Sequence, residues 1–153
     1  MPEEIGEIIH HLKDTQESIY GDLKILSGEL IQNSLQKKIF ITAAWSGWGK
    51  VSASRATTRV LSQTFKGKSI DLLIFTGVAG SVNEKLAQWD IVIAKSLIQH
   101  DMDARPLYPK YVIPPINKIN IDASKTLVNW SESVMKQAVK SKKLKAFGQI
   151  VIG

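Results

Sequence analysis

The sequence IDLLIFTGVAGS, residues 70–81, decides the fold class that we expect for this chain. Its first eight residues are almost wholly apolar, which is typical of a strand buried on both faces of a parallel sheet. The rest of the chain predicts strands and helices in alternation, an order typical of α/β proteins. We expect one domain over residues 1–153, with three αβα layers around a mostly parallel or mixed central sheet. The expected strands are 23–31, 37–44, 70–77, 90–98 and 148–153, and the expected helices are 2–12, 51–63 and 123–143.

The composition narrows the class of protein. The 153 residues are 44% hydrophobic and 22% charged, which is an ordinary balance for one globular domain. No cysteine is present, so disulfide frameworks and thiolate metal sites are excluded. The sequence has no apolar run long enough for a membrane span, and MPEEIGEIIHHLK lacks a signal-peptide core. We therefore expect a cytoplasmic protein without membrane binding.

The formal net charge of +6 has two interpretations. A basic chain can bind nucleic acid, but many of the lysines here fall in KQAVKSKKLKAFG, residues 136–148. Cations are favoured near the C-terminus of a helix, so these lysines suit a solvated helix end. No basic motif interleaved with aromatic residues accompanies them. We prefer the second interpretation and do not expect a nucleic-acid partner; affinity that falls steeply with salt would indicate one.

Two glycine-bearing segments follow predicted strands, where parallel α/β sheets bind their ligands. In WSGWGK, residues 45–50, the glycines allow a tight turn, and Trp48 offers an apolar surface to a ligand, whereas Trp45 suits packing at the strand end. In TGVAGS, residues 76–81, glycines would let backbone N–H groups face a ligand. The second segment has neither the spacing nor the lysine of a phosphate-binding loop, and a plain strand-to-loop turn explains it equally well.

The segment QHDMDARP, residues 99–106, gathers His100, Asp101 and Asp103 at a predicted strand end. One interpretation is a metal site or a carboxylate pair for acid–base chemistry. The other, which we prefer, is a hydrogen-bonded polar corner that positions the irregular, proline-rich loop 105–117. We expect no metal and no cofactor.

Three segments stand in the order and spacing of a known family. They are MPEEI at 1–5, SGWGKVSASRATTRVL at 46–61 and FTGVAGSVNEKLAQWDIVIAKSLIQHDMDA at 75–104. Together they resemble the 5'-methylthioadenosine/S-adenosylhomocysteine nucleosidases, within the purine nucleoside phosphorylase-like superfamily. The resemblance implies hydrolysis of the N-glycosidic bond of these nucleosides, and also of 5'-deoxyadenosine, which releases adenine in methionine salvage. Such a reaction passes through an oxocarbenium-like transition state and needs a base for the attacking water and an acid for the purine.

The resemblance also assigns roles to individual residues. Glu4 matches the glutamate that activates water, and Trp48 falls where the family places an apolar wall against the 5'-thio substituent. Tryptophan is bulky there, so the resemblance favours a methylthio group over homocysteine. Val78 matches a position beside the ribose and the water where some members carry serine, so only its backbone could serve. The other residues assigned to the substrate are Gly77, Ala79 and Gly80 of the same loop and Val151 and Ile152 of the strand that leads into the adenine pocket.

The proline-rich loop resembles the segment that reaches into the neighbouring subunit of the family's homodimer. Leu107 and Pro115 would then cap the partner's alkylthio group. The partners implied by the resemblance are therefore a small-molecule nucleoside and a second copy of the chain.

The chain departs from the family pattern at both ends. The strand that precedes Met-x-Glu-Glu is absent, and so are the later ribose-binding residues and the aspartate that protonates the purine. We therefore expect a truncated nucleosidase that alone has little or no activity. The exposed sheet edges of such a chain should favour association or aggregation.

Other functions stay open at this point. A nucleoside phosphorylase or a futalosine hydrolase would belong to the same superfamily, and phosphate dependence would identify the phosphorylase. Arg55 and Arg59, on the helix after WSGWGK, suit solvent or a partner better than a phosphate site. A non-catalytic nucleoside-binding or dimerising remnant of the fold would bind adenosine analogues without turnover.

Overall fold

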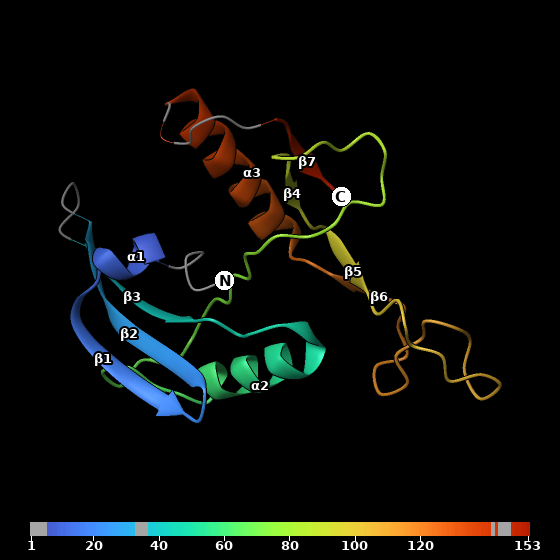
Figure 1. Ribbon diagram of the computed structural model, residues 1–153, viewed down its shortest axis with the longest axis horizontal. Coiled ribbons are helices and arrows are strands. Elements are labelled where there is room, and N and C mark those ends of the chain that lie inside the picture. Colours follow the sequence, from blue (N-terminus) through green and yellow to red (C-terminus); the bar gives the residue numbers. More distant parts are fainter. Residues whose placement is uncertain (1–5, 33–36, 142, 144–147) are drawn as a thin grey trace. The chain divides into compact units, whose positions relative to one another are not determined.

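A computed structural model describes residues 6–32, 37–141, 143 and 148–153 of the chain. The chain divides into two compact units, Met1–Ala79 and Gly80–Gly153. Each unit contains strands and helices, and both parallel and antiparallel strand pairs occur, so the predicted α/β class is confirmed (Figure 1). No helix in the described parts of the chain has the length and apolar character needed to span a membrane.

The first unit is an antiparallel sheet with a helix against it (Figure 1). The short helix α1, Gly6–His10, precedes strands β1, Lys13–Tyr20, β2, Leu23–Gln32, and β3, Lys37–Ala44. The strands pair in the order β1-β2-β3. Helix α2, Gly49–Leu61, follows β3, as the sequence predicted to within two residues at each end.

The core of this unit forms between β2 and α2. Leu23 and Ile25 are two residues apart on a strand, so both point to the same face, and both are fully buried. They pack with Ala56 and Val60, which are four residues apart on α2 and therefore share one side of the helix. The core therefore forms where the apolar face of β2 packs against the apolar face of α2.

Two arginines of α2 hold the β1–β2 turn. Arg55 Nη1 donates a hydrogen bond to Asp22 Oδ1 at 2.7 Å. The guanidinium of Arg59 lies 4.5 Å from the ring centroid of Tyr20, a cation–π distance. Both side chains are exposed, as predicted, and each also contacts the neighbouring hairpin of the same unit.

The apolar segment 70–77 differs from its prediction. It is neither helix nor strand, and residues 71–77 are all exposed. A strand must satisfy its backbone N–H and C=O groups along a neighbour, and none of the described strands pairs with this segment. The prediction of a strand buried on both faces is wrong for this structure for that reason.

The second unit contains two short sheets and one long helix. Strands β4, Ile91–Ile93, and β7, Ile150–Ile152, pair in parallel, and β5, Ser96–Ile98, pairs antiparallel with β6, Asn120–Asp122. The strand predicted over 90–98 is thus two strands with different neighbours. Helix α3, Lys125–Lys140, contacts β4 and β7 and has Val128 as its buried residue.

The connection between β5 and β6 is irregular, as predicted from its prolines. Residues 99–119 contain no helix and no strand, only turns and an isolated bridge between Ile113 and Lys118. In Figure 1 this loop extends from the ends of β5 and β6. It presents most of its side chains to solvent.

Candidate functional site

The turn between β3 and α2 presents Trp48 to solvent. Gly47 and Gly49 have φ values of +80° and +81°, a backbone conformation that side chains rarely allow. Trp48 lies between them as the first residue before α2 and is 80% exposed, whereas Trp45 at the strand end is 39% exposed. The glycines are therefore required by the path of the turn, and that path leaves the Trp48 indole free to contact a ligand.

The loop after segment 70–77 is open along its length. Gly77, Val78 and Ala79 end the first unit and Gly80 begins the second, and all four are exposed. Within the described residues, none of the four makes a backbone hydrogen bond. Their N–H groups are therefore available as donors, which is the property that a loop beside ribose and water requires.

Val151 and Ile152 lie in the short parallel ladder of the second unit. Val151 pairs with Val92 and Ile152 pairs with Ile93, and both side chains are half-buried. Each strand of this ladder has only three residues. The two apolar side chains are thus fixed by a small element whose ends need further support.

The polar corner preferred from the sequence is present at residues 103–105. Arg105 donates to both carboxylate oxygens of Asp103, from Nε at 2.9 Å and from Nη2 at 2.6 Å. This hydrogen bonding by Arg105 lowers the pKa of Asp103 to about 2. The described residues contain no group of three or more potential ligands that could hold a metal ion. Asp103 is therefore an ionised structural acceptor and a poor proton donor at neutral pH.

Leu107 and Pro115 both lie on the exposed loop between β5 and β6. Leu107 is one of the most exposed large apolar residues described. An apolar side chain held in water gains free energy when another surface covers it. These two positions therefore have the exposure that contact with a partner would require.

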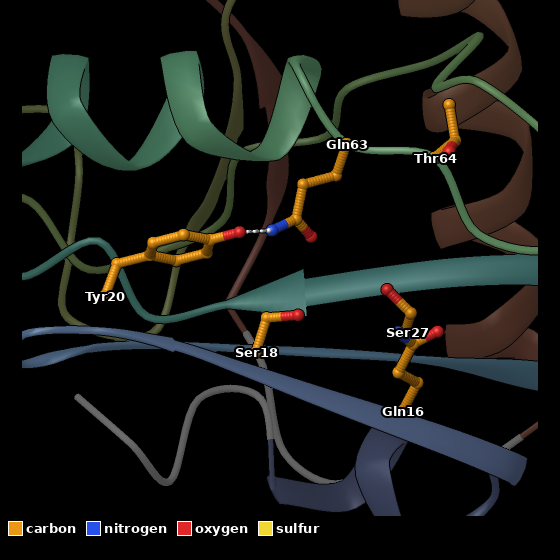
Figure 2. Close-up of a pocket in the computed structure, with 6 residues that line it drawn as sticks. All are labelled: Gln16, Ser18, Tyr20, Ser27, Gln63 and Thr64. Carbon is orange, nitrogen blue, oxygen red and sulfur yellow. Dashed lines mark hydrogen bonds between the residues drawn. The ribbon is translucent and has the colours of Figure 1, made fainter.

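A hollow of about 210 Å³ opens beside the sheet of the first unit. Figure 2 shows its lining, in which Gln63 Nε2 donates to the Tyr20 hydroxyl at 2.9 Å. Ser27, which also lines it, shares a 2.8 Å hydrogen bond with Thr42 on β3. The lining is polar and has no carboxylate, imidazole or amine; it consists of Gln16, Ser18, Tyr20, Ser27, Gln63 and Thr64. No sequence pattern marked these residues.

Comparison with known families determines the family of this chain. A sequence model described as the phosphorylase superfamily matches residues 1–151. The chain belongs to the phosphorylase superfamily.

The curated relatives that match this chain bear the same enzyme name. A 5'-methylthioadenosine/S-adenosylhomocysteine nucleosidase of Staphylococcus haemolyticus is 31% identical over 153 residues, which are 100% of this chain and 61% of that protein. A nucleosidase of the same name from Oceanobacillus iheyensis is 32% identical over 136 residues, 89% of this chain and 55% of that protein. The chain thus spans about three fifths of the length of the curated relatives it matches.

Solved structures of the same kind have the same fold. The nucleosidase of Campylobacter jejuni has a TM-score of 0.78 and 25% identity, covering 99% of this chain and 59% of that one. The nucleosidase of S. pneumoniae, bound to a transition-state inhibitor, has a TM-score of 0.71 and 27% identity, again with 99% and 59% coverage. These likenesses confirm the phosphorylase- and nucleosidase-like α/β fold.

The predicted site residues of this superfamily member are distributed over both units. Trp48 and residues 77–79 belong to the first unit, and Gly80, Val151 and Ile152 belong to the second. Glu4 lies outside the described residues. Their roles at a substrate stay predictions. The sequence analysis gave no role to Asp90, which accepts a hydrogen bond from Gln149, the residue immediately before β7. The available signal was an acidic residue immediately before an apolar strand.

Proposed function

We propose that the whole protein hydrolyses the N-glycosidic bond of 5'-methylthioadenosine and S-adenosylhomocysteine, and also of 5'-deoxyadenosine, releasing adenine in methionine salvage. The observation that carries the proposal is the match of all 153 residues to a nucleosidase of this name. The S. pneumoniae relative bound to a transition-state inhibitor supports a nucleoside as the ligand class. Because the family model spans both units, we also propose that they belong to one domain.

The proposed mechanism uses few groups of this chain. Glu4 acts as the base that removes a proton from water as it attacks the anomeric carbon. The exposed amides around Val78 orient the ribose and the water, and Trp48 covers the 5'-thio substituent. Val151 and Ile152 belong to the strand that leads into the adenine pocket. Charge develops on the sugar in the transition state, so the value of these contacts lies in holding the reacting atoms in position.

We assign the acid that protonates the purine to no residue of this chain. Asp101 and Asp103 do not match the position of the family's aspartate, and the pKa of Asp103, which Arg105 lowers to about 2, keeps that residue ionised at neutral pH. A general acid needs a proton to give at the working pH. The relatives extend well beyond the length matched here, and we place the acid in that further part.

We also propose that the whole protein is a homodimer and that it is located in the cytoplasm. The exposure of Leu107 and Pro115 on the β5–β6 loop supports contact of this loop with the second copy's alkylthio site.

A nucleoside phosphorylase is the second candidate within the superfamily. It would need cationic groups that hold phosphate. Arg55 and Arg59 are engaged by Asp22 and Tyr20, which favours water over phosphate as the nucleophile. Adenine release at the same rate with and without inorganic phosphate would support the hydrolase, and strict phosphate dependence would overturn it.

The decisive test compares two adjacent glutamates in the whole protein. Glu4→Gln should lower kcat for 5'-methylthioadenosine by about two to four orders of magnitude, the usual contribution of a general base. Glu3→Gln is the matched control and should leave kcat nearly unchanged. Binding of adenine, measured by calorimetry, should persist in both variants. A near-normal kcat for Glu4→Gln would remove Glu4 from the mechanism.

A further inference from the structure

Asp90 connects two segments of the second unit that are far apart in sequence. Its Oδ1 accepts a hydrogen bond from the backbone N–H of Gln149 at 2.9 Å. Its Oδ2 accepts from Gln149 Nε2 at 3.0 Å and from the N–H of Ala87 at 2.9 Å. One carboxylate thus joins the turn before β4 to the residue that leads into β7.

Gly148 makes this contact possible. A Cβ atom built on Gly148 would lie 1.9 Å from Asp90 Oδ1, far inside any distance that real Cβ atoms show. The Asp90 carboxylate therefore occupies the space that a side chain at position 148 would need. The N–H of Gly148 also donates to the carbonyl of Trp89 at 3.3 Å, so the two backbones approach closely here.

The contact stands at the start of the β4–β7 ladder. The N–H of Ile91 donates to the carbonyl of Gln149 at 2.9 Å, and Ile91 then pairs with Ile150. A ladder of only three residue pairs does little to prevent β7 from shifting its register against β4. A slip by one residue would turn Val151 and Ile152 to the opposite faces of the strand.

The charge state of Asp90 suits this role. Hydrogen bonds from the N–H groups of Ala87 and then Gln149 lower the pKa of Asp90 below its ordinary value. The carboxylate therefore stays ionised at neutral pH, and charge-assisted bonds to backbone N–H groups are stronger than neutral ones.

We propose that Asp90 is a positioning residue for the purine site: it fixes the register of β7 against β4, and so positions the strand that carries Val151 and Ile152 and leads into the adenine pocket. The proposal rests on the proposed function, which assigns adenine to this strand. Asp90 itself does not touch the substrate. It acts through Gln149 and through the close approach of Gly148.

The first arm of the test uses the 153-residue chain and needs no activity. Hydrogen exchange of the β7 amides is measured for wild type, Asp90→Ala, Asp90→Asn and the matched control Asp122→Asn, whose side chain is exposed on β6. Asp90→Ala should raise exchange roughly ten- to a hundredfold, the factor for losing hydrogen bonds to a charged group. Asp90→Asn keeps one acceptor oxygen and should recover part of the protection. Unchanged exchange in Asp90→Ala would overturn the proposal.

A double variant tests the contact itself. Gly148→Ala alone should disturb β7, because its methyl group meets the carboxylate. In the Asp90→Ala background that collision is gone, so Gly148→Ala should add little further exchange. Fully additive effects of the two changes would show that Gly148 is not held against Asp90, and would overturn the proposal.

The second arm uses the whole protein and separates positioning from folding. Asp90→Ala should raise KM for 5'-methylthioadenosine about tenfold while kcat changes about threefold or less, because the purine contact is displaced and the water base is not. Faster exchange with unchanged KM would make Asp90 a structural clamp only and overturn its positioning role. Wild type that releases no adenine would instead refute the proposed function, and the exchange arm would still report on the clamp.

Discussion

Two apolar regions of the first unit differ in solvent exposure. In the β2–α2 core, Leu23 is 1% exposed, whereas Leu73, in the longer apolar run 70–77, is 49% exposed. β2 has β1 and β3 as direct neighbours through short connections, so its backbone is satisfied locally. Segment 70–77 has no such neighbour among the described strands. In this structure the apolar strand with two paired neighbours is buried, and the apolar run without a strand partner is exposed.

The same substitution in both regions tests whether they differ in burial, and it has the largest expected effect. Leu23→Ala should lower the free energy of unfolding of the 153-residue chain by about 2–5 kcal/mol, because it removes buried methyl groups and leaves a cavity. Leu73→Ala should change it by about 0.5 kcal/mol or less, as expected for an exposed position. Urea denaturation of both variants measures the two values. Equal losses would mean that segment 70–77 is buried in solution.

The reasons for success and failure of the sequence predictions follow from the same contrast. β2, β3, α2 and α3 were predictable because each carries its own apolar period. β1 was missed because KDTQESIY is mostly polar and exposed; it is a strand through its pairing with β2.

The candidate site also has one feature that the sequence predicts and one that it does not. The turn at Trp48 could be predicted from its glycines, whose positive φ values are a local property. The link between Asp90 and Gln149 spans 59 residues and depends on how two strands meet. The acidic residue before an apolar strand is a local signal, but no local pattern identifies its partner, so only the folded chain could reveal the contact.

The second prediction concerns a buried charge on the core sheet. The Glu29 side chain is 6% exposed and is bound by Lys66 at 2.5 Å and Lys38 at 2.9 Å. Hydrogen bonding by Lys66 and then Lys38 lowers the pKa of Glu29 below its ordinary value of 4.5. The folded state therefore releases this proton more readily than the unfolded state, and the resulting stability is present above pH 4.5 and lost as pH falls below it.

Glu29→Gln should accordingly lower Tm at pH 7. Its Tm should also change less than that of wild type between pH 7 and about pH 3. Glu17→Gln is the matched control on β1, where the ion pair with Lys24 is exposed, and it should change Tm little. Scanning calorimetry across this pH range gives both profiles. A Tm difference for Glu29→Gln that persists undiminished at about pH 3 would assign the effect to packing and not to charge.

The smallest effect on stability is expected in the open segment itself. Ile74 is exposed, so Ile74→Lys should leave the free energy of unfolding within about 0.5 kcal/mol of wild type. It should nevertheless reduce self-association, because a charge interrupts an exposed apolar run with unpaired backbone groups. Light scattering at increasing protein concentration measures the change.

Val82→Lys is the control for added charge, since Val82 is fully exposed but lies outside the apolar run. Single exposed apolar residues are ordinary on protein surfaces, so this variant should associate like wild type. A clean wild-type monomer would show that segment 70–77 is covered within the chain. An equal reduction by Val82→Lys would mean that net charge, and not the open segment, controls association.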